Sequence, residues 1–172
     1  MKRPKRKEII TMLTESNYIE QEYSEEALED AIEAWDWAWK NRDSISVDYI
    51  LTIHRKLAQR IAPKIAGKIR DCDVYIGGHR KWFLSETLIK EDLQEIVRLM
   101  NSTNFESGKE EEYTKHVHVM FENIHPFVDF NGRSGRCLYN IHRLKLGLPI
   151  HTIKADWPDK EGEQYQYYQW FK

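Results

Sequence analysis

The segment from His125 to Arg136, His-Pro-Phe-Val-Asp-Phe-Asn-Gly-Arg-Ser-Gly-Arg, gathers an imidazole, a carboxylate, a short amide and two guanidinium groups. Apolar residues at helical spacing flank it on both sides. A polar loop that runs into a helix N-terminus suits a phosphate, because backbone N–H groups point outward there and the helix dipole favours negative charge. The segment therefore predicts an anion site between two helices.

Single side chains of this segment also have defined chemistry. Arg133 and Arg136 can each bind a phosphate through two N–H groups. Asp129 can hold a magnesium ion that keeps its waters and shares phosphate oxygens. His125, at the loop entrance, can take a proton from an attacking hydroxyl. The alternative is a plain helix–loop–helix turn with an Arg–Asp salt bridge, which explains each residue alone but explains the whole ordered set less well.

Composition narrows the class of protein. The chain has 172 residues, of which 41% are hydrophobic and 31% are charged, which fits one domain with a real core. A net charge of −2 gives no overall basic field for nucleic acid. No apolar run follows the basic start or approaches the length of a membrane span. We therefore expect a cytoplasmic protein with no membrane or nucleic-acid partner, and structural roles for the isolated thiols Cys72 and Cys137.

Apolar periodicity predicts a mainly α fold. Helices are expected over residues 3–13, about 25–41, from Ser44 or Ser46 to Pro63, 87–101, 111–124, and from the motif to Gly147. Ser24 and Ser85 are predicted N-caps. His54 falls on a core-facing stripe and is interpreted as a core histidine. The aromatic tail, 160–172, is expected to pack on the body, with a patch for a partner or a base as the alternative.

Residues 73–84 differ from the rest, because β-forming residues alternate on both sides of a glycine pair. This pattern predicts a hairpin, and we expect no other β structure. The free edge of such a hairpin can capture an extended segment of another protein by strand addition. A plain connecting hairpin explains the pattern equally well. The residues concerned are Val74, Tyr75, Ile76, Gly77, Gly78 and His79.

The motif resembles the signature of the Fic family, His-Pro-Phe-x-Asp/Glu-Gly-Asn-Gly-Arg-x-x-Arg. Each fixed position matches except Phe130, where the family usually has glycine. The order of helices, hairpin, helices, motif and helix over residues 44–147 is similar as well. The resemblance implies a Fic-type helical bundle with one β-hairpin flap over the active-site loop. Residues 1–43 would form an inhibitory helical segment and residues 148–172 a C-terminal tail of one domain.

The resemblance implies an adenylyltransferase that moves AMP from ATP, with Mg²⁺, to a Ser, Thr or Tyr hydroxyl of a target protein docked on the flap. Family members often dimerise, so a homodimer is also open. The implied roles follow the motif: His125 as base, Phe127 as buried anchor, Asp129 as magnesium ligand, Asn131, Gly132 and Gly135 as nucleotide-binding residues, Arg133 at the β-phosphate and Arg136 at the γ-phosphate.

Two further features qualify this function. Ser16-x-x-x-Glu20 resembles an inhibitory pattern of the family, in which Glu20 would pair with Arg136 and compete with the γ-phosphate. The alternative is that Glu20 only begins an acidic helix. Phe130 leaves four outcomes open: a donor other than ATP, removal of AMP, a catalytically impaired binding module, or an intact loop whose ring turns into the core.

Overall fold

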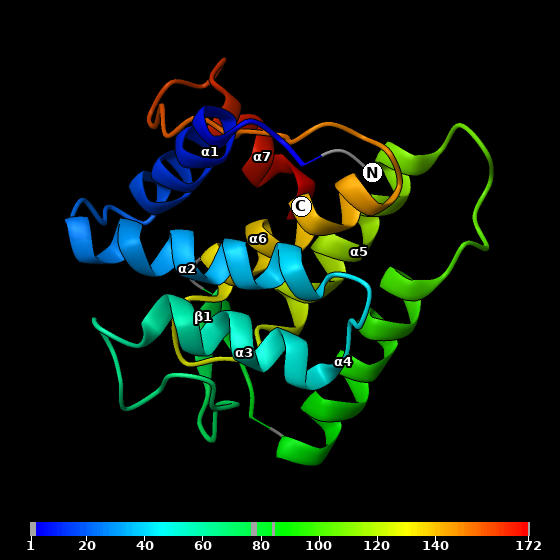
Figure 1. Cartoon of the computed structure of the whole chain (residues 1–172). Helices are drawn as coiled ribbons and strands as arrows, with labels where there is room; N and C mark the ends of the chain where they lie inside the picture. Colours follow the sequence, from blue (N-terminus) through cyan, green and yellow to red (C-terminus); the bar gives the residue numbers. More distant parts are fainter. Residues whose placement is uncertain (1–2, 77–78, 84, 172) are drawn as a thin grey trace.

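The computed structural model describes residues 3–76, 79–83 and 85–171, and it confirms the mainly helical fold (Figure 1). The helices are α1 (Arg6–Ile19), α2 (Glu25–Asn41), α3 (Val47–Ala58), α4 (Glu86–Asn101), α5 (Glu110–Ile124), α6 (Asn131–Lys145), α7 (Glu163–Tyr168) and a final 3₁₀ turn, η1 (Gln169–Phe171). None of the described helices is long and apolar enough to cross a membrane.

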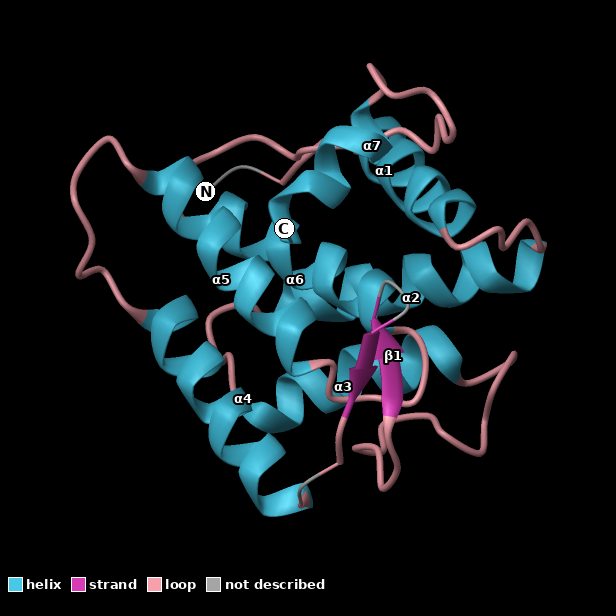
Figure 2. Cartoon of the chain, turned by 180° about the vertical axis from the view of Figure 1, so that it is seen from behind, coloured by secondary structure: helices cyan, strands magenta, loops and turns pink. Residues whose placement is uncertain are grey.

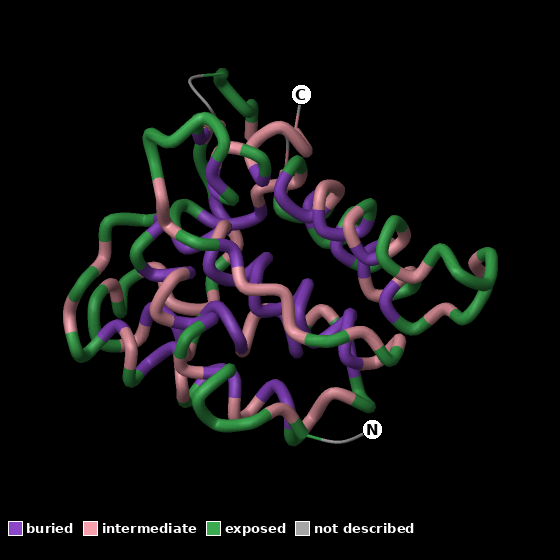
Figure 3. The backbone as a smooth tube through the Cα atoms, turned by 90° about the horizontal axis from the view of Figure 1, so that it is seen from above, coloured by how far each residue is buried: buried purple, intermediate pink, exposed green. Residues whose placement is uncertain are grey.

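Helix α6 is the centre of the bundle, and α1, α2, α3 and α5 all contact it. From residue 133 to residue 144 every residue of α6 is buried, including the arginines. Figure 3 shows the buried parts of the backbone gathered mainly in the interior of the molecule. A helix that is buried all round needs partners for its polar side chains, since an unpaired buried charge is costly. The fold therefore places the second half of the motif in the interior, where each polar contact matters.

The predicted caps are present. The hydroxyl oxygens of Ser24, Ser46 and Ser85 each accept the backbone N–H three residues later, at the starts of α2, α3 and α4. The prediction that the first helix ends at residue 13 was wrong, because α1 continues to Ile19. Two polar residues hid this continuation: Ser16 and Asn17 interrupt the apolar pattern, yet both are buried in the structure.

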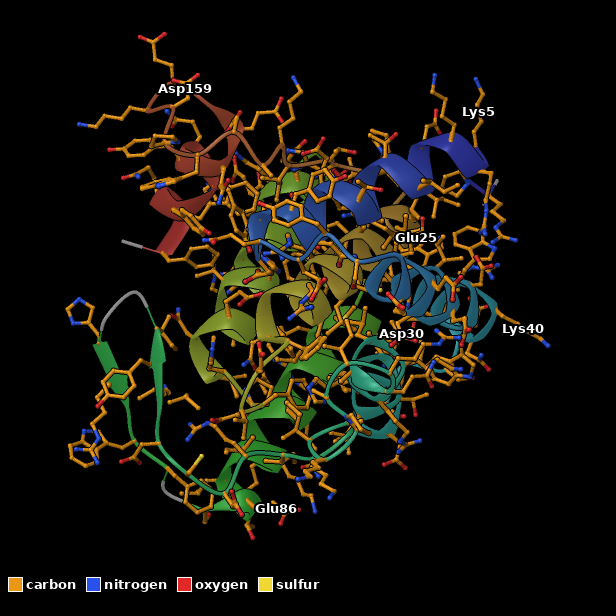
Figure 4. The ribbon with its side chains drawn as sticks, turned by 90° about the vertical axis from the view of Figure 1, so that its left-hand side faces the viewer. Lys5, Glu25, Asp30, Lys40, Glu86 and Asp159 are labelled. Atoms are coloured by element: carbon orange, nitrogen blue, oxygen red, sulfur yellow. The ribbon has the colours of Figure 1, made fainter. Side chains whose placement is uncertain are left out.

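The hairpin has the predicted form in the residues that the structure describes. β1 (Val74–Ile76) pairs antiparallel with β2 (His79–Lys81), with Tyr75 opposite Arg80. The predicted turn at Gly77 and Gly78 lies outside the described residues. Figure 4 shows this flap standing clear of the helices at one side of the molecule, and in Figure 2 it lies in front of the helices.

The C-terminal segment returns to the start of the chain. Ile153 and Tyr167 form a small apolar cluster with Ile19 at the end of α1, apart from the main core. The Glu15 carboxylate accepts the Ala155 N–H at 2.8 Å. The two ends of the described chain thus lie together above α6, and α1 and α7 lie near each other in both Figure 1 and Figure 2.

Candidate active site

The motif forms a short loop between α5 and α6 with a left-handed residue at each end. His125 is the C-cap of α5, with φ 49°, and Phe130 is the N-cap of α6, with φ 62°. Left-handed backbone at a helix C-cap ends the helix and turns the chain sharply. Phe130, the second left-handed residue, comes directly before Asn131. Helix α6 therefore begins at the end of the loop, and its first turn faces the loop.

Interior contacts fix this loop. Phe127 is fully buried, and its N–H and C=O bond to the Asn131 side-chain amide at 2.9 Å each. The His54 ring stacks on Phe127 at 3.7 Å, and its Nε2–H donates to the Asp129 carbonyl at 3.1 Å. His54 Nδ1 accepts the Gly67 N–H, and burial lowers the pKa of His54 to about 4. Phe127 is thus the anchor expected, whereas the Asn131 amide is committed to the loop, leaving only its backbone N–H for a phosphate.

The contacts of His125 define which of its ring nitrogens carries the proton. Its Nδ1 lies 3.1 Å from the Glu122 carbonyl oxygen, which can only accept, so Nδ1 carries the proton. Nε2 is then the nitrogen with a free lone pair. Burial lowers the pKa of His125 below its ordinary value, although the Glu122 carbonyl opposes this. The imidazole is therefore neutral at neutral pH and can accept a proton at Nε2.

Arg136 is buried and held by the end of α1. Its Nε donates to Ser16 Oγ at 2.9 Å, and its Nη2 donates to the Ser16 carbonyl at 2.9 Å and to Glu20 Oε1 at 2.6 Å. The ion pair expected between Glu20 and Arg136 is therefore present. Burial opposes ionisation of Glu20, but the charge and hydrogen bond of Arg136, together with the charges of Arg133 and His125, keep the pKa of Glu20 below its usual value.

Gly132 lies directly against this ion pair. A methyl group at this position would overlap Glu20 Oε1 and come within 2.8 Å of the Arg136 guanidinium. Gly135, one turn further, lies instead against the Glu122 carboxyl group, which a methyl group there would overlap. The lack of a side chain at Gly132 thus leaves room for the Glu20 carboxylate beside Arg136, whereas Gly135 makes room for Glu122 in the packing of α5 on α6.

Arg133 faces a different environment. Its guanidinium carbon lies 3.6 Å from the centre of the Phe130 ring, and its Nη2 is 3.6 Å from Asp129 Oδ1. Phe130 itself is 3% exposed and belongs to the main core. The structure therefore agrees with one of the four outcomes left open for Phe130: the ring turns into the core and the loop is formed.

One cleft of about 760 Å³ joins these elements. Several predicted site residues line it: Glu20, Tyr75, Ile76, His79, His125, Gly132 and Arg136. Aromatic residues of the tail form another wall, namely Trp157, Tyr165, Tyr167, Tyr168 and Phe171. The predicted base, the buried arginine and the flap thus face one volume, whereas Asp129, on the loop, and Arg133, in the first turn of α6, are not among the residues that line it.

Two groups of cleft residues were not among the predicted site residues. The tail was expected mainly to pack, and Tyr167 does so, with its hydroxyl 2.9 Å from His118 Nε2. The many aromatic residues after residue 156 were the signal in the sequence that the tail could also form a wall of the cleft. Glu122 was the other omission. It is 8% exposed, and burial raises its pKa to about 7. Its place three residues before His125 on the same helix was the only hint.

Asp129, the expected magnesium ligand, has an exposed carboxylate. Its side chain is 64% exposed, beside Arg133 at the start of α6. Magnesium commonly uses one or two protein carboxylates and completes its shell with water and phosphate oxygens. No group of three or more metal-ligating side chains occurs among the described residues, so a site here would rely on a nucleotide for its other ligands.

A helical bundle thus places an imidazole, a buried arginine and the start of α6 at one cleft. Residues 44–142 match the sequence profile of the Fic/DOC family, and the chain belongs to that family. It is 34% identical over 110 residues to protein adenylyltransferase fic-1 of Caenorhabditis elegans, which covers 64% of this chain and 21% of the relative. It is 29% identical over 124 residues to protein adenylyltransferase Fic of Drosophila persimilis, covering 72% and 23%.

Solved structures agree on the fold. Fic-1 from C. elegans superposes with a TM-score of 0.72 at 22% identity, covering 95% of this chain and 54% of that chain. A Fic-domain signalling protein from Bacteroides thetaiotaomicron gives 0.74 at 16% identity, covering 95% and 70%. The chain spans only about a fifth to a quarter of the length of the sequence relatives above.

Proposed function

We propose that this domain transfers AMP from ATP to a hydroxyl group of a target protein, and that Glu20 restrains the reaction. The observation that carries the proposal is the arrangement of Arg136. Its guanidinium lies in the first turns of α6, beside the space left by Gly132, and faces the same cleft as His125. A phosphate chain lying at the N-terminus of α6 would meet backbone N–H groups and two arginines.

In the reaction, His125 Nε2 would take the proton of the target hydroxyl as its oxygen attacks the α-phosphorus of ATP. The bond from that phosphorus to the bridging oxygen breaks, and pyrophosphate leaves. Gly132 N–H and the two arginines would hold the phosphate oxygens as charge moves onto them. Mg²⁺ held by Asp129 would neutralise the charge of the leaving pyrophosphate.

The walls of the cleft offer surfaces for the nucleobase of ATP and for the target protein. Rings of the tail, among them Tyr165 and Tyr168, offer flat apolar surfaces on which a nucleobase can stack. The flap brings Ile76 of β1 to the same cleft, and its open edge suits an extended segment of the target. Such a segment would place its hydroxyl between the flap and His125.

Glu20 occupies the guanidinium that a γ-phosphate would need. Its carboxylate is 2.6 Å from Arg136, and the low pKa keeps it charged at neutral pH. ATP entering beside it would meet a negative charge instead of a free arginine. A productive complex would therefore need Glu20 to leave Arg136.

The experiment measures label transfer from α-labelled ATP, including self-labelling. Replacing Glu20 with Gly should raise transfer on the order of 10- to 100-fold, the value of one charge-assisted hydrogen bond. Adding His125→Ala should remove the gain. The exposed Glu29 on α2 provides the matched control, because Glu29→Gly removes a carboxylate of the same kind away from the cleft.

The Glu20→Gly variant should also be offered labelled GTP, UTP, CTP and an AMP-modified protein. Transfer from another nucleotide alone would replace ATP as donor, and loss of AMP from the modified protein would identify the reverse reaction. No transfer with any donor, together with no binding of Mg-ATP at millimolar concentration, would contradict the transferase proposal.

A further inference from the structure

Phe130 occupies a backbone position that disfavours its side chain. Its φ of 62° lies in the left-handed region, which a non-glycine residue adopts only at a cost in backbone strain. Glycine would avoid this cost, so the phenyl ring must make contacts that offset it. The ring is 3% exposed, packs in the main core and meets the His54 ring edge-on at 6.0 Å.

Arg133 packs against the Phe130 ring. The guanidinium carbon of Arg133 lies 3.6 Å from the ring centre, so the planar cation covers one face of the ring. The Arg133 side chain is 9% exposed, and its Nε is buried with no hydrogen-bond partner among the described residues. The carboxylate of Asp129 is 3.6 Å from its Nη2, beyond ordinary hydrogen-bond distance.

We propose that Phe130 is a positioning residue that holds the Arg133 guanidinium ready for the β-phosphate of the donor. The inference rests on the proposed function, which places a nucleotide at this loop. A guanidinium stacked on a ring keeps its N–H donors at the free edge and loses few further conformers when it binds an anion. A glycine at residue 130 would leave that face of Arg133 without support.

This arrangement predicts selectivity between nucleotides. ADP and ATP carry a β-phosphate for Arg133 to hold, whereas AMP does not. Loss of the ring should therefore weaken binding of ADP and leave binding of AMP nearly unchanged. A ring that only stabilised the fold would change both affinities together, since the whole cleft would loosen.

The test is calorimetry of Mg-ADP and AMP binding to the full chain, in the Glu20→Gly background that frees Arg136. Phe130→Leu keeps an apolar side chain in the core but removes the ring face, and Phe130→Gly restores the usual family residue. Both should weaken ADP binding about fivefold to tenfold, with AMP affinity unchanged. Phe121→Leu is the matched control, because Phe121 is also a buried core ring but lies on α5, where its ring contacts Phe127, and both nucleotide affinities should stay unchanged.

A double-mutant cycle shows whether Phe130 acts through Arg133. In an Arg133→Ala background, Phe130→Leu should cause no further loss of ADP affinity. An undiminished loss in that background, or equal losses for ADP and AMP, would overturn the inference. If the Glu20→Gly parent itself binds neither nucleotide, the proposed function fails and the inference fails with it. Thermal melting of each variant checks folding, and Phe130→Leu carries the test if Phe130→Gly does not fold.

Discussion

The two arginines of the motif lie one turn apart on α6, yet they are held in opposite ways. Arg136 is bound by Ser16 and Glu20, which lie 120 and 116 residues away in the sequence. Arg133 is supported by Phe130, which is the N-cap of the same helix and lies three residues away. A carboxylate can be exchanged for a phosphate of like charge, whereas a ring stays in place when the phosphate arrives. The contact of Arg136 with Glu20 is thus exchangeable, whereas the contact of Arg133 with Phe130 is permanent.

The electrostatics of the two residues follow the same division. Burial works against the charge of Arg136, but Glu20 restores it, and the pKa of Arg136 is raised. Burial lowers the pKa of Arg133, and Asp129 compensates only in part. Both remain cations, since the ordinary arginine pKa is far above neutral. Truncation of Arg136 and truncation of Arg133 should therefore lower the free energy of unfolding by different amounts.

The largest difference is expected when each arginine is truncated. Arg136→Ala leaves Glu20 without its cation and removes three hydrogen bonds, so the free energy of unfolding should fall by about 3–4 kcal/mol. Arg133→Ala removes one stacking contact and should cost about 1 kcal/mol. Urea denaturation at neutral pH measures both. Equal losses would show that the long-range contact does not differ in strength from the local one.

A second expectation concerns Glu122, which lines the cleft with Arg136. Its pKa in the folded chain is about 7, above the ordinary value of 4.5, because the carboxyl group is buried. The folded chain thus holds this proton more tightly than the unfolded chain. Its contribution to stability is complete below pH 4.5 and is lost as the pH rises through about 7.

Glu122→Gln removes this titration. Between pH 4.5 and pH 8, the unfolding free energy of the variant should rise relative to that of the natural chain by on the order of 2–3 kcal/mol. Denaturation series at both pH values give the difference. Glu112→Gln, on the exposed side of α5, should show almost no change over the same range. A flat difference for Glu122→Gln would mean that its carboxyl group ionises freely in the folded chain.

Local chemistry explains what the sequence predicted well. Ser24, Ser46 and Ser85 act as caps because each bonds to a backbone N–H three residues later. The loop forms as expected because Phe127 and Asn131 bond within the segment itself. The hairpin depends on alternation over adjacent residues. Contacts of this kind are encoded within a few positions, so a linear pattern reveals them.

Contacts between distant segments explain what was missed. His54 supports the Asp129 carbonyl across 75 residues, so its apolar stripe indicated a core position and not its role in the loop. The tail reaches the cleft only because Ile153 and Tyr167 pack on the end of α1. Helix α1 was predicted too short because Ser16 is a buried polar residue whose partner, Arg136, lies far along the chain. Pairing of this kind cannot be read from spacing.

The smallest expected effect separates the two α1 contacts of Arg136. Ser16→Ala removes the hydroxyl that accepts from Nε at 2.9 Å but keeps the Ser16 carbonyl and Glu20. The cost should be about 1–2 kcal/mol of unfolding free energy, because one buried N–H loses its acceptor. Label transfer from ATP should rise only a few-fold, well below the gain from Glu20→Gly, since the competing carboxylate remains. Ser44→Ala, in an exposed turn, controls for the loss of a hydroxyl. If Ser16→Ala matched Glu20→Gly in transfer, the restraint would lie in the position of α1 and not in the charge at Arg136.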